Sequence, residues 1–422
     1  MLLLTHPIGN QNVRAALRGF KDAGILSEFH TSIAAFPNDL MYRLGGLPAL
    51  GEIRKRTFDK DLRALTRVDP FIETGRLLAS KISWKALIQH EDGVFCIDAV
   101  SRRSSRYSAR QLNRQKGDLL KAVYAYEDAA LEVFQRAKQM GLLNLYDLPI
   151  GYWRAARQLM QEELDKRPEW ASTLTSFKDS ENKLKRKDEE LNLADHVFVA
   201  SSFTKKTLES YPGHLAPVHV IPYGFPEANL TREYTYIVGR PLKLLFVGGL
   251  SQRKGIANVL EAVEMLGDMV DLTIIGRKTS EDCRPLNEGL KKHRYIPSLA
   301  HGEILKAMRE HDVLLFPSLF EGFGLVITEA MSQGTPVITT DRTAGADLIE
   351  DGKDGWLVEA GNTNALIQKI EEILLDPAVV ERTGKAARLK ALQRPWTVYG
   401  SELTVMVEAL MKGNGTHINN DK

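Results

Sequence analysis

The sequence predicts an α/β protein with two doubly wound parallel-sheet domains that face a central cleft. Short apolar runs alternate with amphipathic helical stretches, which is typical of parallel strands covered by helices on both faces. The chain has 422 residues, more than one domain usually contains. Pro, Gly and polar residues interrupt the alternation at 226–241, where we expect a linker between two such domains.

The first half of the chain predicts one of these sheets. A strand at Leu2–Thr5 leads through a turn at Gly9 into a helix at Val13–Ala23. The charged stretches 44–85 and 162–191 are expected to be mostly helical. The other elements expected here are strands at 122–126, 142–146, 196–200 and 219–221 and a helix at 129–140.

The second half predicts the other sheet with a cleaner alternation. Its expected strands are 244–247, 271–275, 313–316 and 337–340, and its expected helices are 256–266, 301–309, 325–332 and 363–375. We therefore expect an N-terminal Rossmann-like domain at 1–235 and a C-terminal one at 236–395, followed by a helix at 396–412 and a disordered tail at 413–422.

The composition excludes several other classes of protein. Hydrophobic residues make up 43% and charged residues 26%, which excludes collagen-like, coiled-coil and wholly disordered chains. The 56 Lys and Arg nearly balance the 54 Asp and Glu, so no nucleic-acid partner is expected. Cys96 and Cys283 are too few for a disulfide framework or zinc site, and predict reduced thiols in the cytoplasm. No run is long enough to predict a signal peptide or membrane span.

A glycine-rich turn follows the strand at 244–247. Gly248 and Gly249 allow a tight turn, and Arg253, Lys254 and Gly255 precede a helix. Free amides at a helix N-terminus, together with two cations, predict an anion site that suits phosphates. The pattern is neither a Walker A loop nor a dinucleotide-binding Gly-x-Gly-x-x-Gly. The alternative is a common Gly-rich turn with two exposed cations.

A second candidate region joins the strand at 313–316 to the next helix. Glu321 lies in the loop at the carboxyl end of the strand, and Glu329 lies about one turn into the helix. We expect both carboxylates to accept hydrogen bonds from hydroxyls of a ribose or sugar ring. The amides of Phe323, Gly324 and Leu325 open the helix and suit a diphosphate. The alternative is two solvent-facing glutamates.

These residues lead to a family resemblance. Glu-x7-Glu, preceded by Pro-Ser and followed by Ala-Met-x-x-Gly-x-Pro-Val-Ile, resembles the retaining GT-B glycosyltransferases of family 4, the glycosyl transferases group 1. The resemblance covers the whole C-terminal domain and about half of the N-terminal one. The similar segments are 194–205, 220–224, 248–256, 312–340 and 345–358.

The resemblance implies a role for each candidate residue. Glu329 would hold the ribose hydroxyls of a nucleotide, and Glu321 a hydroxyl of the donor sugar. Arg253 and Lys254 would neutralise the diphosphate as it leaves, the electrostatic contribution usually worth most in such chemistry. Gly9 would lie in the N-terminal loop that closes over the phosphates and the acceptor. The backbone amides at 323–325 would add hydrogen bonds to sugar and phosphate.

Two positions depart from the family pattern. Many relatives have Arg at the position of Gly249, and many have a cleft-facing His where this chain has Tyr146 followed by Asp147. Glu127, at the end of the neighbouring strand, and Asp147 are therefore our candidates for orienting or deprotonating the acceptor hydroxyl. The alternative for both is a cap on a helix or turn.

The same resemblance suggests further features. Base recognition in this fold uses backbone groups, which we expect near Ile296. The final helix, 396–412, would cross back to the N-terminal domain, although a plain core-packing helix fits almost as well. Asp59 and Asp61 form an Asp-x-Asp sequence, but a helix would point them to different faces, and no histidines have ligand spacing. No metal and no cofactor are therefore expected.

The function implied is a cytoplasmic, metal-independent, retaining glycosyltransferase. It would move a sugar from a nucleotide-diphosphate-sugar donor to a hydroxyl-bearing glycan or glycolipid acceptor in cell-surface polysaccharide or glycolipid biosynthesis. The alternatives are a nucleotide-sugar epimerase of the same fold and a catalytically silent nucleotide-binding homologue. The base, sugar, acceptor and linkage stay open.

One further surface is unusually basic. The segment 43–121 holds 17 Lys and Arg against 9 Asp and Glu. It is either a solvated helical face or a surface that meets anionic lipid at the inner membrane face.

Overall fold

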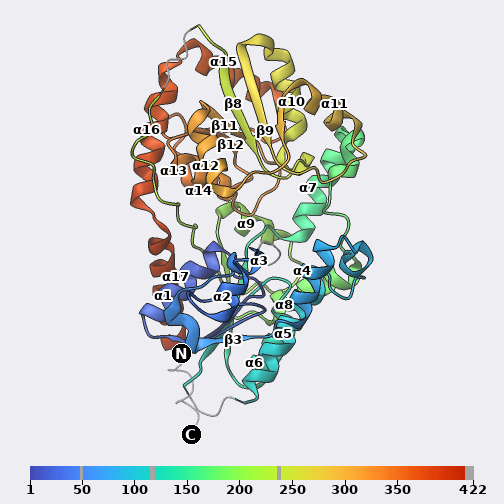
Figure 1. The fold of residues 1–422 in the computed structure, drawn as a ribbon, viewed down its shortest axis with the longest axis vertical. Coiled ribbons are helices and arrows are strands. Elements are labelled where there is room, and N and C mark those ends of the chain that lie inside the picture. The colour runs from blue at the N-terminus through green and yellow to red at the C-terminus, as the bar shows by residue number, and fades with distance from the viewer. Residues whose placement is uncertain (48–50, 115–118, 235–238, 414–422) are drawn as a thin grey trace.

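The computed structural model describes residues 1–47, 51–114, 119–234 and 239–413, and contains two sheets in which every pairing is parallel (Figure 1). The first sheet has the strand order β3-β2-β1-β4-β5-β6-β7 and the second β10-β9-β8-β11-β12-β13. In each, the order reverses beside the first strand, as in doubly wound folds. The predicted α/β architecture of two parallel-sheet domains is confirmed.

The strands are short and mostly buried. The first sheet consists of β1 (Leu2–Thr5), β2 (Leu26–Thr31), β3 (Thr66–Val68), β4 (Ala122–Tyr126), β5 (Leu143–Leu148), β6 (His196–Val199) and β7 (Val218–Val220). The second consists of β8 (Leu242–Val247), β9 (Val270–Ile275), β10 (Arg294–Ile296), β11 (Val313–Phe316), β12 (Val337–Thr340) and β13 (Trp356–Val358).

Helices cover the sheets. The first part of the chain forms α1 (Gln11–Asp22), α2 (Leu40–Leu44), α3 (Gly51–Arg54), α4 (Phe71–Lys81), α5 (Ile97–Leu112), α6 (Leu131–Gln139), α7 (Trp153–Lys166), α8 (Glu181–Leu193) and α9 (Ser202–Thr207). The second forms α10 (Ile256–Leu266), α11 (Arg284–Lys292), α12 (His301–Glu310), α13 (Leu325–Ser332), α14 (Gly345–Leu348), α15 (Thr363–Leu375), α16 (Ala378–Gln393) and α17 (Trp396–Gly413). The 3₁₀ helices used below are η2 (Lys60–Leu65), η3 (Lys85–Ile88) and η4 (Pro168–Thr173).

The prediction of a mostly helical stretch at 44–85 is wrong in one part. Within it, β3 pairs with β2 at the edge of the first sheet, although both strands are poor in apolar residues. β2 has the sequence Leu-Ser-Glu-Phe-His-Thr, and its buried His30 bonds to Ser108 and Glu28. Polar side chains that find partners inside the fold hide the alternation of a strand.

Two segments that connect the domains, one near Phe225 and one near Pro395, lie side by side. Phe225 forms a β-bridge with Pro395, and its amide donates to the carbonyl of Arg394 at 2.8 Å. Gly224 is required here, since a Cβ at that position would lie 2.4 Å from Cα of Trp396. The predicted boundary at 235/236 and the predicted tail beyond Gly413 lie outside the described residues.

The last helix, α17, packs along α1 of the first sheet (Figure 1). A Cβ at Gly19 would lie 2.4 Å from the carbonyl oxygen of Gly400, so the two helix backbones touch. The final helix therefore rests on the N-terminal domain, while α16, which precedes it, packs on α13 of the C-terminal domain.

A second bridge between the domains was not predicted. Helix α7 leads from the N-terminal domain towards the second sheet (Figure 1). Trp170 of the following η4 packs into the hydrophobic core of the second domain, where it is only 4% exposed. In the part of the chain that the structure describes, no helix is long and apolar enough to cross a membrane.

Candidate functional site

The glycine-rich loop at 248–255 connects β8 to α10. Gly248 donates its amide to the carbonyl of Ile275 at 3.0 Å, which holds the start of the loop against β9. Gly255 has φ +73° and ends the loop at the N-terminus of α10. A Cβ at Gly255 would lie 2.1 Å from the carbonyl oxygen of Pro317, so only glycine lets this loop approach the neighbouring strand end.

Three charged side chains meet where this loop faces the next one. The ammonium of Lys254 forms an ion pair with the carboxylate of Glu321 and lies 4.9 Å from the ring centre of Phe316. Arg253 donates to the carbonyl of Phe320 at 2.7 Å and to Oε2 of Glu321 at 3.2 Å. Two cations thus share one carboxylate.

The positive charges of Lys254 and Arg253 are only partly neutralised by Glu321. Burial lowers the pKa of Lys254 well below its ordinary value, and the adjacent Arg253 charge lowers it further. Burial also lowers the pKa of Arg253. One carboxylate does not offset the burial of two cations, so a further anion would stabilise their charged forms.

The N-terminus of α13 lies at the same loop. Gly324 caps the helix with φ +88°, and the carbonyl of Phe323 accepts a hydrogen bond from the amide of Ala344 at 2.9 Å. The amides of Phe323, Gly324 and Leu325 have no acceptor among the described residues. Free amides at a helix start can donate to an anion or to sugar oxygens.

Glu329 lies one turn further along α13. Its carboxylate oxygen Oε1 is 3.7 Å from Nδ1 of His301, and its side chain is 21% exposed. Burial raises its pKa from 4.5 to about 7. A carboxylate held in this way, with no strong cationic partner, is suited to accept hydrogen bonds from a bound hydroxyl pair.

Replacing Glu329 should stabilise the protein at alkaline pH. The folded carboxyl keeps its proton up to about pH 7, whereas the unfolded one releases it near 4.5, so the folded state loses stability as the pH rises between these values. Glu329→Gln should raise the free energy of unfolding by roughly 1–3 kcal/mol at pH 8 and change it little at pH 5. Urea unfolding at both pH values measures this, and an equal effect at both would contradict the assignment.

Three of the predicted site residues make no hydrogen bond with the charged side chains of Arg253, Lys254 and Glu321 among the described residues. Gly9 (φ +79°) donates its amide to Nδ1 of His6 at 2.8 Å, at the carboxyl end of β1. A Cβ on Gly9 would lie 2.5 Å from the ring of Phe58. Ile296 lies on the edge strand β10, where its carbonyl accepts from Gly276 at 3.0 Å. A Cβ on Gly249 would lie 3.9 Å from the methyl carbon of Thr279, so this position is not crowded.

Comparison with known proteins agrees with this arrangement. A sequence profile described as "Glycosyl transferases group 1" matches residues 231–390, which include both loops and both glutamates. Residues 231–390 are therefore similar to a group 1 glycosyltransferase domain, which confirms the predicted resemblance for this stretch.

Curated relatives match over part of the chain. A phosphatidyl-myo-inositol mannosyltransferase of Mycobacterium leprae is 33% identical over 173 residues, which are 40% of this chain and 46% of that protein. A capsular polysaccharide biosynthesis glycosyltransferase of Staphylococcus aureus is 27% identical over 166 residues, 38% and 44% of the two chains. The chain thus spans less than half the length of these relatives.

Solved structures share the fold over nearly the whole chain, which confirms the predicted GT-B architecture. Sucrose-phosphate synthase of Thermosynechococcus elongatus superposes with a TM-score of 0.62 at 18% identity, over 98% of this chain and 99% of that one. The Anabaena protein HepE in complex with UDP and glucose gives 0.60 at 15% identity, over 97% and 99%.

The two predicted acceptor-side carboxyls lie on the N-terminal sheet, each with its own partner. Asp147 accepts from the hydroxyl of Tyr124 at 2.7 Å and lines a small cavity with Tyr223 and Tyr399. Burial raises its pKa to about 7, and the Tyr124 hydrogen bond opposes the rise. Glu127 lies 3.3 Å from the ammonium of Lys187, and burial raises its pKa to about 7.

These contacts leave the acceptor role of Glu127 and Asp147 a prediction. Neither carboxyl hydrogen-bonds to a residue of the glycosyltransferase domain within the described ranges. Asp147 is nevertheless linked to that domain through aromatic packing, because the ring of Tyr223 lies 4.8 Å from the ring of Phe323.

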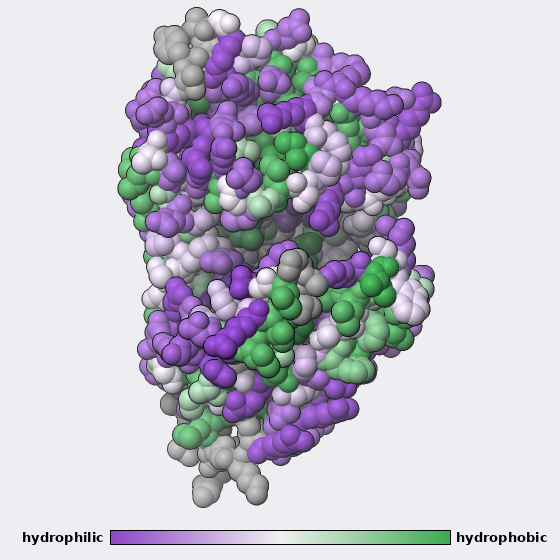
Figure 2. Space-filling model, viewed as in Figure 1, coloured by the Kyte–Doolittle hydropathy of each residue, from purple (hydrophilic) through white to green (hydrophobic). Residues whose placement is uncertain are grey.

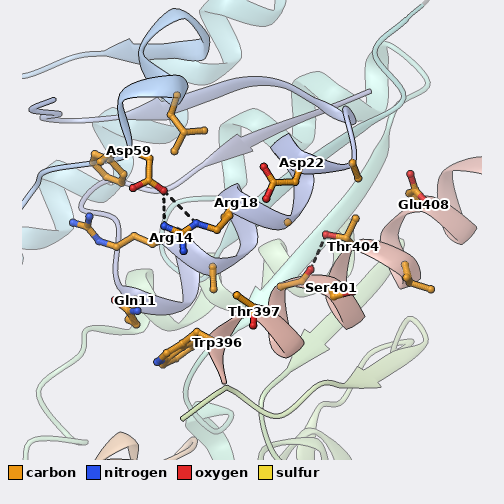
Figure 3. A pocket seen from close by; sticks show the side chains of 17 residues that line it. Gln11, Arg14, Arg18, Asp22, Asp59, Trp396, Thr397, Ser401, Thr404 and Glu408 are labelled. Atoms are coloured by element: carbon orange, nitrogen blue, oxygen red, sulfur yellow. Dashed lines mark hydrogen bonds and ion pairs between the residues drawn. The ribbon is translucent and has the colours of Figure 1, made fainter. Parts of the chain in front are cut away.

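Another pocket, of about 570 Å³, lies between α1, η2 and α17 on the N-terminal domain (Figure 3). Its cations already have partners. Arg14 donates to the carbonyl of Lys55 at 2.9 Å, and Arg18 pairs with Asp59 at 2.7 Å. The Asp-x-Asp carboxylates are therefore engaged, because Asp61 also lies 3.1 Å from an α1 ammonium. This pocket offers an incoming anion less charge than the loop at 248–255 does.

One cluster contains residue types that bind metals. His90, Glu91 and Asp179 each offer a ligand atom within 4.8 Å of the others. They also satisfy one another, since Nε2 of His90 lies 2.9 Å from Asp179. The cluster belongs to the N-terminal domain and does not include a predicted site residue.

The sequence did not predict the contacts that hold the loop at 248–255 against α7 and η4. Gln252 is fully buried and donates to Glu163 of α7 at 2.6 Å. The carbonyl of Thr173 accepts from the hydroxyl of Ser251 at 2.7 Å. These pairs lie 78 and 89 residues apart in sequence, so no local motif marks them.

Proposed function

We propose that the protein is a retaining glycosyltransferase that moves a sugar from a nucleotide-diphosphate-sugar donor to a hydroxyl-bearing glycan or glycolipid. The observation that carries this proposal is the pair Arg253 and Lys254 sharing Glu321 beside three free amides of α13. This arrangement can accept a diphosphate, and the group 1 profile supports the donor class. Retention of configuration is supported by the family-4 motif around Glu321 and Glu329.

The geometry suggests an exchange of partners when the donor binds. Without donor, Lys254 and Arg253 are neutralised in part by Glu321. Phosphate oxygens would take the place of this carboxylate on the cations and would accept from the amides of the α13 N-terminus. Glu321 would then be free to accept a hydrogen bond from a hydroxyl of the donor sugar. Glu329 would receive the ribose hydroxyls in the same binding event.

The same charges would act on the leaving group. As the bond between the sugar and the diphosphate breaks, negative charge grows on the phosphate oxygens. The buried Arg253 and Lys254 are fixed near this charge before the reaction, so little reorganisation is needed. This role requires no metal ion.

The acceptor is proposed to belong to cell-surface polysaccharide or glycolipid assembly. Relatives named for phosphatidyl-myo-inositol mannosyl transfer and for capsular polysaccharide biosynthesis support this class. Asp147 and Glu127 remain our candidates for orienting or deprotonating its hydroxyl.

A thermal-shift screen tests the donor site. UDP, GDP, dTDP, ADP and their sugars are each added with and without EDTA. We expect one nucleotide to raise the melting temperature, because a ligand at 100 times its Kd adds about 2.7 kcal/mol of stability. The shift should survive EDTA. No shift with any nucleotide would contradict the donor site, and sugar isomerisation without acceptor would favour an epimerase.

We also propose peripheral contact with an anionic membrane at the cytoplasmic face. Apolar side chains gather on the visible face of the N-terminal domain, over α2 and α4 (Figure 2). Phe71, the first residue of α4, and Trp84, which precedes η3, are 67% and 57% exposed. The surrounding segment 43–121 carries the excess of Lys and Arg noted above. Exposed apolar side chains beside cations are suited to the headgroup region of a bilayer.

Vesicle sedimentation tests this contact. The protein should bind vesicles that contain phosphatidylglycerol and not vesicles of phosphatidylcholine alone. Phe71→Ser with Trp84→Ser should weaken binding by about tenfold, since burial of two large side chains is worth a few kcal/mol at most. Leu375→Ser, at an 87% exposed position of the C-terminal domain, is the matched control. Equal binding of all three proteins would contradict the proposal.

A further inference from the structure

Helix α7 and the following η4, residues 153–173, form a strut that is fixed to both domains. Its first turn is fixed to the N-terminal domain, where Trp153 donates to Asp188 at 2.8 Å and Arg154 donates to the same carboxylate at 2.6 Å. Arg157 donates to the carbonyl of Asp179 at 2.8 Å. The helix then leaves this domain, as its course in Figure 1 shows.

The far end of the strut is fixed to the C-terminal domain. Trp170 packs among the buried side chains of α10 and the second sheet. Arg167 pairs with Glu261 of α10, and the carbonyl of Thr173 accepts from the hydroxyl of Ser251. The hydroxyl of Thr173 also accepts from the amide of Gln252 at 3.1 Å. The strut therefore ends on the loop at 248–255.

Glu163 makes a further buried contact with this loop. Its Oε1 accepts from the side-chain amide of Gln252 at 2.6 Å, and its side chain is 7% exposed. The Gln252 side chain also donates to Asn258 at 3.0 Å and accepts from the amide of Ala257 at 2.8 Å. Both amide hydrogens and the amide oxygen of Gln252 thus have partners, and these three contacts hold its rotamer.

The position of Gln252 bears directly on the cations. It immediately precedes Arg253 and Lys254, whose side chains meet Glu321 on the opposite side of the loop. The carbonyl of Arg253 accepts from the amide of Leu319 at 2.9 Å, so the loop is held on both sides. A shift of the Gln252 side chain would move the backbone that carries both cations.

We propose that Glu163 is a positioning residue for the donor phosphates: from the N-terminal domain's helix α7, it fixes Gln252 and thereby the placement of Arg253 and Lys254. The role in donor binding rests on the proposed function, whereas the ordering of the loop does not. The charged groups that face Glu163 are Arg167, at 3.6 Å, and, farther away, Lys166 and Arg342.

A charge exchange between the two residues tests the proposal. Gln252→Glu would place a carboxylate against Glu163, and the double change Glu163→Gln with Gln252→Glu would restore one hydrogen bond with its direction reversed. Glu163→Leu removes the acceptor without adding a charge, and serves if Gln252→Glu does not fold. Thermal unfolding of each variant checks the fold.

Two measurements are made on the full-length variants. Amide hydrogen exchange at 248–256 without ligand should become at least about tenfold faster in Gln252→Glu and return to within about threefold of the parent in the double variant. The KM for the donor should rise about tenfold with a smaller change in kcat, and should recover in the same double variant.

The outcomes separate the two proposals. Exchange and KM unchanged in both Gln252→Glu and Glu163→Leu would overturn the positioning role, as would a double variant as impaired as Gln252→Glu. If the parent binds no nucleotide, the proposed function fails, but the hydrogen-exchange comparison still decides whether Glu163 orders the loop.

Discussion

Glu321→Gln is expected to reduce the turnover of sugar transfer by a factor of about 100 or more, with nucleotide binding nearly intact. The carboxylate of Glu321 is proposed to hold the donor sugar, whereas the nucleotide is held by other groups. Initial-rate kinetics measure turnover, and calorimetry measures binding of the nucleoside diphosphate. Glu310→Gln, on the exposed end of α12, is the control and should change neither.

The same variant has a second expected effect. Without the Glu321 charge, Arg253 and Lys254 lose their shared carboxylate, so the melting temperature of the ligand-free protein should fall. A bound diphosphate would supply the missing negative charge, so its stabilising effect should be larger than in the parent. Parent-like turnover in Glu321→Gln would remove Glu321 from the mechanism.

Lys254→Ala should weaken binding of the nucleoside diphosphate about 100-fold and binding of the nucleoside less than about threefold. The reason is that the Lys254 ammonium is proposed to bind the phosphates, whereas Glu329 is proposed to bind the ribose hydroxyls. Calorimetric titration of both ligands measures the two effects. Lys292→Ala changes an exposed lysine that pairs with Glu264, and should alter neither affinity. Equal losses for both ligands in Lys254→Ala would contradict the assigned role.

The elements that could be predicted from the sequence are those in which local pattern and tertiary environment agree. The strand at 313–316 and the helix at 325–332 have the bounds expected, because every residue of that strand is apolar, Pro317 follows its last residue, and Gly324 precedes the first residue of the helix. Glu321 precedes the start of this helix and Glu329 lies in its second turn, so both come from one short segment. Lys254 and Glu321 follow adjacent parallel strands, whose carboxyl ends share one edge, but their ion pair itself was not predicted.

The elements that could not be predicted depend on distant partners. β2 contains Glu28 and His30, whose polarity is offset only by contacts with Arg67 and Ser108 in the folded chain. The contact of Glu163 with Gln252 joins a charged helix to a loop of another domain. Neither segment carries a signal of the other, since hydrogen bonding at long range depends on the assembled topology rather than on spacing.

Trp170 follows a helix of the N-terminal domain but packs in the core of the C-terminal domain, and this limits how the protein can be divided into fragments. The stretch that matches the family profile, 231–390, contains neither Trp170 nor Thr173, so we expect it to fold poorly by itself. Excised at those bounds, it would expose the apolar socket that Trp170 fills and leave Ser251 and Gln252 without the acceptors that Thr173 provides. An expression fragment of the donor-side half would therefore aggregate or misplace its loop unless residues 153–173 were supplied with it, as a covalent graft or as a separate peptide.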